Sequence, residues 1–160
     1  MLVLTVLTIF FFSGCKTEEI TIEHEIIFED NAYVRGTTSG AGYINLMEHQ
    51  EWVANRSSIR EITGVKIQYR VTRNRTPSDV TVVFYFGESR ADVYLGNAIL
   101  AQGETHAELQ DLSLESSSTQ LIDLIMRKNA FWYSIQGNTT SADVDIEPVK
   151  ITIYGTFEVN

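Results

Sequence analysis

The most enzyme-like residues of this chain surround Ser89. Residues 87–91, with the sequence GESRA, follow an apolar segment and miss by one residue the G-x-S-x-G pattern that places a nucleophilic serine between a strand and a helix. Residues 92–97 have the pattern of a strand, whereas a nucleophile elbow needs a helix there. His106 also follows too closely for the usual order of serine, acid and histidine on that fold. We therefore expect Ser89 to lie in a polar turn, and we expect no enzymatic activity.

Metal ligands are also sparse. The histidines are His24, His49 and His106, which are far apart and show no zinc-binding spacing. Calcium is the better candidate, because Asp143, Asp145 and Glu147 alternate along the chain and would present oxygen ligands on one face of a strand. Alternating acids are, however, more often the solvated face of a strand. We expect no metal and no cofactor.

Two tryptophans are the remaining candidates for a binding site. Trp132 lies between Phe131 and Tyr133, and alternation along a strand sends it to the face opposite these two neighbours. Trp52 lies in a polar stretch, residues 47–58, that we expect to form a short helix or turn with Trp52 and Val53 inward. An exposed tryptophan on a β-sandwich can stack against a sugar ring or anchor a protein partner. Packing in the core or at a sheet edge is the commoner role, and both interpretations stay open.

The only cysteine, Cys15, closes an uncharged apolar segment. The run from Leu2 to Phe12 is 11 residues long, which suits a signal-peptide core and is short of the roughly 20 residues that span a bilayer. Residues 12–15, with the sequence FSGC, resemble the lipobox of bacterial lipoproteins. The resemblance implies that residues 1–14 are removed and that Cys15 carries diacylglycerol, often with a further acyl chain on its new amino group. The alternative is a buried N-terminal strand with an ordinary core cysteine.

The charge of the chain excludes some partners. Its 12 Lys and Arg against 21 Asp and Glu give a net charge of -9, which argues against nucleic acid, because phosphates demand clustered cations. The same charge argues against binding of anionic lipid headgroups by the folded domain. The lipid on Cys15 would then hold the membrane, since each buried methylene contributes about 0.8 kcal/mol.

The sequence predicts a single domain that carries these candidate residues. We divide the chain into a signal peptide at 1–14, a tether at 15–19 and a single domain at 20–160. Period-two alternation of apolar residues recurs along that domain, and one apolar stripe with capping-box spacing predicts a helix at about 117–128. Without regular alternation of strands and helices, the pattern predicts a mainly β fold. The expected architecture is an antiparallel β-sandwich, Ig-like or similar, with one or two short helices.

Several strand boundaries follow from the same pattern. We expect a turn at 29–31 between two N-terminal strands, and neighbouring antiparallel strands at 65–71 and 80–86. Gly96-Asn97 suits a tight hairpin, and residues 105–114 suggest a further strand with a bulge. The five apolar residues of 149–159 that share one parity predict a long final strand that is integral to the core.

These observations favour a lipid-anchored cell-envelope protein whose β-sandwich binds or scaffolds and does not catalyse. The tether, Lys16 to Glu19, is similar to those of surface-exposed lipoproteins in some Gram-negative lineages, which favours the outer membrane. The expected partners are the membrane, through the lipid, and a glycan or an envelope protein. Two alternatives stay open: a carbohydrate-binding module that uses Trp132 or Trp52, and an assembly subunit that exchanges an edge strand.

Overall fold

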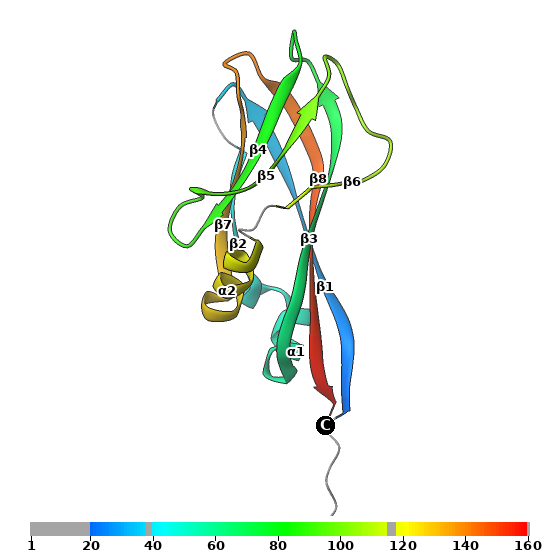
Figure 1. Ribbon diagram of the computed structural model, residues 1–160, viewed down its shortest axis with the longest axis vertical. Coiled ribbons are helices and arrows are strands. Elements are labelled where there is room, and N and C mark those ends of the chain that lie inside the picture. Colours follow the sequence, from blue (N-terminus) through cyan, green and yellow to red (C-terminus); the bar gives the residue numbers. More distant parts are fainter. Residues whose placement is uncertain (1–19, 38–39, 115–117, 160) are drawn as a thin grey trace, which may run out of the picture.

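Two antiparallel four-stranded sheets form the molecule (Figure 1). The computed structural model describes the backbone of residues 20–37, 40–114 and 118–159, and the side chains of those residues between 25 and 158. Sheet A has the order β1 (Ile20–Arg35), β8 (Asp143–Val159), β3 (Ile59–Asn74), β6 (Gln110–Asp111). Sheet B has the order β2 (Gly40–Asn45), β7 (Ala130–Gly137), β4 (Val80–Gly87), β5 (Val93–Leu100). The predicted antiparallel β-sandwich with short helices is confirmed. The predicted signal peptide, Cys15 and the tether lie outside the described residues.

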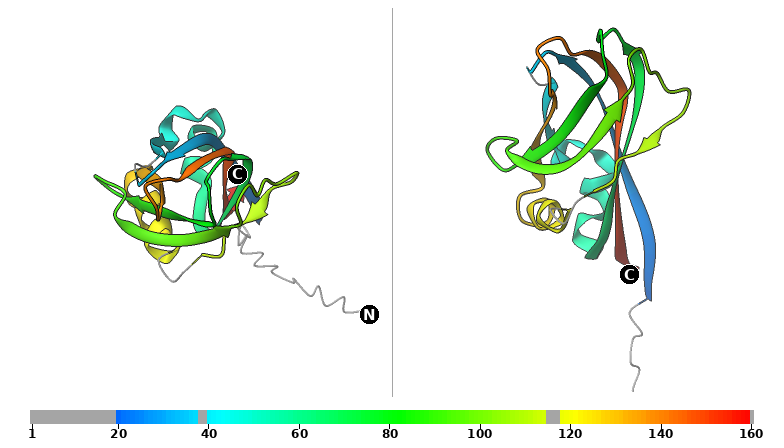
Figure 2. Two further views of the ribbon diagram at one scale, coloured as in Figure 1. Left: turned by 90° about the horizontal axis from the view of Figure 1, so that it is seen from above. Right: turned by 45° about the horizontal axis from the view of Figure 1, so that its top comes forward.

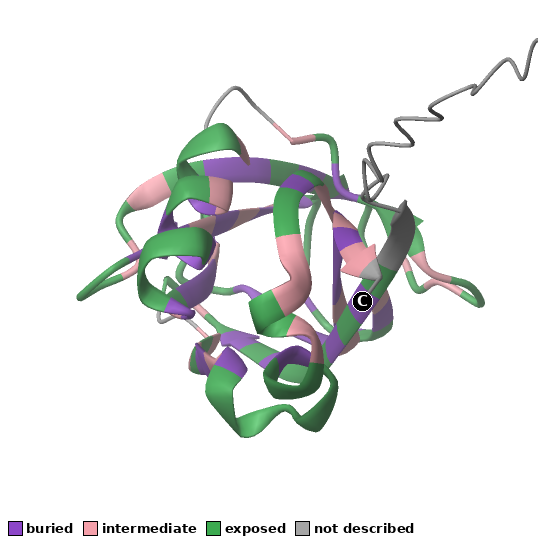
Figure 3. Ribbon diagram, turned by 90° about the horizontal axis from the view of Figure 1, so that it is seen from below, coloured by how far each residue is buried: buried purple, intermediate pink, exposed green. Residues whose placement is uncertain are grey.

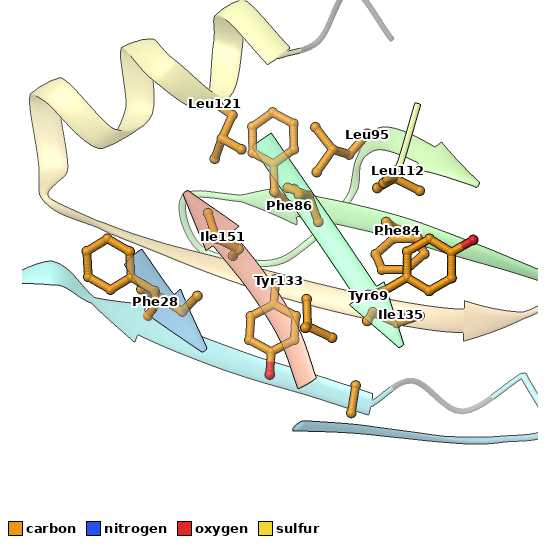
Figure 4. Close-up of a cluster of buried hydrophobic side chains, with 14 of the residues drawn as sticks. Phe28, Tyr69, Phe84, Phe86, Leu95, Leu112, Leu121, Tyr133, Ile135 and Ile151 are labelled. Atoms are coloured by element: carbon orange, nitrogen blue, oxygen red, sulfur yellow. The ribbon is translucent and has the colours of Figure 1, made fainter. Parts of the chain in front are cut away.

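The core lies between the two sheets, where alternate residues of each strand point inward. On β4, Val80, Val82, Phe84 and Phe86 are buried, and the intervening residues are half-buried. On β8, Val149, Ile151, Ile153 and Phe157 are buried. Figure 4 shows aromatic and aliphatic side chains from both sheets meeting in this layer. Burial of each such side chain contributes about 1.5–3 kcal/mol, so the inward parity of each strand is strongly specified.

The three long strands of sheet A extend past sheet B at one pole. At that pole Ile20 of β1 pairs with Val159 of β8, and at the opposite end Arg35 pairs with Asp143. Figures 1 and 2 show the short helices beside this extension, below sheet B. They are η1 (Leu46–Glu48), α1 (Gln50–Asn55), η2 (Arg56–Ser58) and α2 (Ser118–Lys128). Seen from below, they turn exposed residues outward and buried ones toward the sheets (Figure 3). No helix in the described part of the chain is long and apolar enough to cross a membrane.

The predicted helix at 117–128 is confirmed as α2. Leu121, Leu124 and Ile125 face the core, and Asn129 ends the helix with a left-handed φ of 54°, a conformation that asparagine tolerates. The Asn129 carbonyl then accepts from the Leu46 amide at 2.9 Å. The helix end is thereby tied to the segment that follows β2.

Two predicted turns are instead continuous strand. β1 runs through residues 29–31, where a bulge between Asp30 and Ala32 replaces the expected turn. Gly96 and Asn97 pair with Phe84 and Val83 of β4, so the expected hairpin between them is wrong. In both places pairing with a single neighbouring strand, β8 for β1 and β4 for β5, continues past the turn-like residues and overrides the local turn preference.

Two further expectations on strands are wrong. The strands at 65–71 and 80–86 are not neighbours, because β3 belongs to sheet A and β4 to sheet B. Alternation identifies each strand, but it does not distinguish a hairpin from a connection that crosses between sheets. Residues 105–114 form only the two-residue β6, and the surrounding backbone is held by bonds to β3, from the His106 amide to Val71 and from the Leu112 amide to Ile67.

Candidate binding site on the outer face of sheet B

Strand β7 places Trp132 on the surface. Phe131, Tyr133 and Ile135 are buried between the sheets, whereas Trp132 points outward and is 39% exposed. The predicted division of Trp132 from its two neighbours is confirmed. Ser134 and Gln136 share the outward parity of Trp132, so these three residues define one line across the outer face of sheet B.

Tyr43 of β2 forms an aromatic pair with Trp132. The two residues are cross-strand partners, their ring centroids are 4.9 Å apart, and their planes are tilted by 41°. Half of Tyr43 is exposed. Adjacent aromatic pairs on a sheet stabilise one another, so the two rings form a firm apolar platform that remains open to solvent.

Gly87 lies opposite Trp132 on its other side, in β4. A side chain there would strike the carbonyl oxygen of Arg90, since a Cβ would lie 1.8 Å from that atom. Gly87 therefore permits the tight turn at 88–92 and puts no side chain beside the Trp132 ring. The turn is held by the ion pairs Arg90–Asp92 at 2.6 Å and Glu88–Lys128 at 2.8 Å. The hydrogen bond from Lys128 lowers the pKa of Glu88, which keeps that pair charged.

A depression of about 330 Å³ lies between the Trp132 ring and this turn. Its lining residues are Ala41, Ser89, Arg90, Ala91, Trp132, Tyr133, Ser134 and Gln136. Ala41 and Ser134 are cross-strand partners, and their small side chains leave space above the sheet. Trp132 and Gln136 lie two residues to either side of Ser134, so their Cα atoms are about 13 Å apart. The depression thus has an aromatic end and a carboxamide end.

A second aromatic pair extends the same face. Tyr85 of β4 is the cross-strand partner of both Ser134 and Tyr94. The Tyr85 and Tyr94 rings meet edge to face, 6.2 Å apart. Tyr94 is on the edge strand β5. Aromatic side chains therefore occur on all four strands of this face, spaced across about 14 Å of sheet.

Tyr133 supports the platform from beneath. Its ring passes directly under Gly42, where a Cβ would lie 2.4 Å from the ring, and its hydroxyl donates to Asp30 at 2.5 Å. Figure 4 shows Tyr133 reaching from the core layer toward β2. Burial, and then the hydrogen bond with Asp30, raise the pKa of Tyr133 well above its usual range. This contact links β7 of sheet B to the bulge of β1 in sheet A.

Trp52, the other predicted ligand-binding tryptophan, is a core residue. It is 1% exposed, and its indole N–H donates to the Asn129 side chain at 3.1 Å. It therefore has no surface on which a ligand could stack, and that prediction is wrong. Val53 was expected to point inward but is 49% exposed. The short helix α1 directs only Trp52 toward the core.

The acids proposed for calcium face arginines. Asp145 contacts Arg35 and Arg73, each at 2.5 Å, and Asp143 contacts Arg35 at 3.2 Å and Arg75 at 3.1 Å. Glu147 accepts from the Thr72 hydroxyl at 3.2 Å. The described residues contain no group of three or more His, Cys, Asp or Glu that could hold a metal ion. Asp143 and Asp145 are thus partners of an arginine cluster at the far end of sheet A, whereas the Glu147 carboxylate has a threonine as its partner.

The remaining candidates are dispersed. Ser89 is exposed in the turn at 88–92, and a strand, not a helix, follows it. His49 packs edge to face on Phe28, and His106 contacts Glu104 at 3.1 Å.

Sequence reasoning found Trp132 but missed the residues that make its surroundings a site. Tyr43 and Gln136 are 93 positions apart, and only the pairing of β2 with β7 brings them to one face. No sequence pattern identifies Ser134 or Gly87 as a site residue, because each contributes to the depression only through its small size. The near match of residues 87–91 to the G-x-S-x-G pattern does identify the turn beside the depression, although that pattern is associated with a nucleophilic serine and not with binding.

Comparisons with known proteins yield no relative of established function. No family model matches the chain, and no curated protein matches it. Among solved structures, one of Desmodium yellow mottle tymovirus is 9% identical with a TM-score of 0.43, covering 100% of this chain and 94% of the other. One of turnip yellow mosaic virus is 12% identical with a TM-score of 0.34, covering 99% and 91%. The function therefore has to be inferred from the residues of this chain.

Proposed function

We propose that this chain is a lipid-anchored binding protein of the bacterial cell envelope that holds its ligand on the outer face of sheet B. The observation that carries the proposal is the solvent-exposed Tyr43–Trp132 pair beside a depression. Singly exposed aromatic rings are ordinary, whereas exposed clusters of them characterise binding surfaces. The depression offers no nucleophile with a base beside it, so the role proposed for it is recognition.

The position of the anchor is compatible with this surface. Cys15 precedes the first residue of β1 by five positions, and β1 begins at the pole where Ile20 pairs with Val159. A lipid on Cys15 would thus tether the molecule by one end, whereas the outer face of sheet B is a lateral face (Figure 1). The acidic domain would be repelled from anionic headgroups, so that face stays available to a ligand. By the similarity of the tether, we place the anchor in the outer membrane.

The strand-exchange alternative gains no support from the final strand. β8 is hydrogen bonded to β1 on one side and to β3 on the other, along nearly its whole length. A donated strand must instead be separable from its own sheet. We therefore prefer binding on a face over exchange of a strand.

The anchor is tested on the protein expressed in a bacterial host. Intact mass and radiolabelled palmitate should show a mature chain that begins at Cys15 and carries lipid. Cys15→Ala should release the protein from the membrane fraction, while a matched Ser13→Ala change should leave it there. A mature chain that begins before Cys15, or unchanged membrane association of Cys15→Ala, would overturn the anchor.

A further inference from the structure

We infer that the depression beside Trp132 recognises an uncharged oligosaccharide. The inference rests on the proposed function, since it names the ligand class of the same surface. Three features of the described residues support it: the shape of the aromatic platform, the charge of the lining and the extent of the face.

The platform suits the flat side of a sugar ring. A pyranose ring has a face of C–H bonds and a rim of hydroxyls, so it stacks on an aromatic ring and hydrogen bonds at its edge. Trp132 offers that ring at one end of the depression, with Tyr43 packed against it at 4.9 Å. The packed partner restrains the indole before the ligand arrives, which lowers the entropy lost on binding.

The rest of the lining suits hydroxyl groups. Ser89 and Gln136 supply hydroxyl and carboxamide groups that both donate and accept hydrogen bonds, and Ser134 lies buried at the floor of the depression. The Gln136 side chain donates to Ser134 only over a long 3.5 Å contact, so a ligand hydroxyl can compete for the Gln136 carboxamide. A sugar hydroxyl, itself donor and acceptor, matches such partners.

Charge selects a neutral ligand. No carboxylate is among the described residues that line the depression, and the one cation, Arg90, is paired with Asp92 at 2.6 Å. The site therefore has no unpaired charge with which to bind an ionised group. The net charge of -9 repels polyanionic chains such as uronic-acid polymers at long range.

The extent of the face indicates more than one sugar unit. The Tyr85–Tyr94 pair continues the aromatic surface on the next two strands beyond β7, with Tyr85 on β4 and Tyr94 on β5. Tyr94 is thus about 10 Å from the β7 strand. A chain of sugars that crosses the strands would contact both aromatic pairs, whereas a single sugar would contact one.

The same features disfavour a protein partner. Interfaces between proteins need about 800 Å² on each side and a desolvated apolar centre. Trp132 and Tyr133 are the large side chains of the described lining, and Tyr133 is buried, so Trp132 alone is exposed enough to serve as that centre. The most exposed aliphatic residue of sheet B, Ile99, is on the edge strand and not among the residues that line the depression.

The test is calorimetric titration of the purified mature protein in detergent micelles. Neutral gluco- and manno-oligosaccharides of one to six units are compared with galacturonic-acid oligomers of equal length. We expect at least one neutral series to bind, with affinity rising from one to several units, and the acidic series not to bind. Trp132→Ala should weaken binding about tenfold or more, and Gln136→Ala several-fold. Trp132→Phe keeps an aromatic ring and should retain most of the affinity. Retained affinity in this variant would show that the domain still folds when Trp132 is replaced.

The matched control is Tyr154→Ala, which removes an exposed tyrosine from the outer face of sheet A and should leave the affinity unchanged. Three outcomes would overturn the inference: no neutral series binds, the acidic oligomers bind best, or Trp132→Ala and Tyr154→Ala behave alike. Capture of an envelope protein that depends on Trp132 would also overturn it but would leave the proposed binding face standing. A failed test of the Cys15 anchor would instead overturn the proposed membrane location and would leave the inferred oligosaccharide binding unaffected.

Discussion

At the residue scale, small side chains shape the outer face of sheet B as much as large ones do. The absence of a side chain at Gly42 lets the Tyr133 ring pack beneath β2. The absence of one at Gly87 permits the turn that borders the depression. Neither position could be singled out from the sequence, because each requirement arises from a neighbour on another strand. Trp132 could be singled out, because alternation alone separates it from Phe131 and Tyr133.

Gly42→Ala should destabilise the domain by about 1–3 kcal/mol, the usual cost of overpacking. A Cβ at Gly42 would lie 2.4–2.6 Å from ring atoms and the hydroxyl of Tyr133. Gly64→Ala is the matched control, since its Cβ would meet only Tyr154, at an ordinary 3.9 Å. We expect Gly64→Ala to be neutral or slightly stabilising. Urea denaturation measures both variants, and equal midpoints would contradict the close approach of Tyr133 to Gly42.

Asp145 should make stability depend on acid pH. Burial opposes its ionisation, but the hydrogen bonds and charges of Arg35 and Arg73 outweigh burial and lower the pKa of Asp145. A lowered folded pKa means that this stabilisation is complete above the unfolded value of about 3.9 and is lost as the pH falls through the folded value. The contribution of Asp145 is therefore constant from neutral pH down to about pH 5 and falls below about pH 4.

Asp145→Asn tests that dependence. At pH 7 it should cost about 1.5–3 kcal/mol, the contribution of hydrogen bonds to a charged group. The difference from the native chain should shrink as the pH falls below 4, which urea midpoints at several pH values would reveal. Asp92→Asn, which removes an exposed ion pair with Arg90, should change stability by less than about 1 kcal/mol. A cost of Asp145→Asn that stays constant down to about pH 2 would show that the carboxylate charge is not responsible.

At the element scale, strands could be predicted but their partners could not. The periodic patterns of β3, β4, β7 and β8 identified strands because one face of each is buried. Alternation carries no information about which strand lies beside which, so the separation of β3 from β4 into different sheets was missed. The turn-like residues at 29–31 and at Gly96-Asn97 misled for a related reason, since pairing with a neighbouring strand overrides a local preference.

The final strand should be indispensable, because β8 holds β1 and β3 together at the centre of sheet A. Phe157→Ala should lower the free energy of unfolding by about 3–5 kcal/mol, since Phe157 is buried. A chain that ends at Glu147 should not fold, because it loses most of the central strand and its four buried apolar side chains beyond that residue. Urea denaturation and circular dichroism report both results. A truncated chain with an unchanged midpoint would restore the strand-exchange alternative.

At the scale of the whole molecule, the proposed anchoring pole lies apart from the proposed binding face. Ile20 of β1 pairs with Val159 of β8 at one pole, and the aromatic pairs occupy the side of the shorter sheet B. The sandwich predicted from the sequence is confirmed and the anchor stays a prediction, yet the sequence could not place Tyr43, Gln136 and the 88–92 turn around Trp132. Those residues come from two strands, β2 and β7, and from the turn that follows β4, and only the pairing of sheet B brings them together.

The central claim is that the outer face of sheet B is occupied in the envelope, and hydroxyl-radical footprinting tests it most directly. Oxidation of Trp132 and Tyr43 is measured by mass spectrometry on intact cells and on the purified protein, with Tyr154 and Tyr33 on sheet A as internal references. We predict that Trp132 and Tyr43 are protected several-fold in cells relative to the purified protein, while the two reference tyrosines are not. Equal oxidation of Trp132 in both samples, with the references unchanged, would contradict the account.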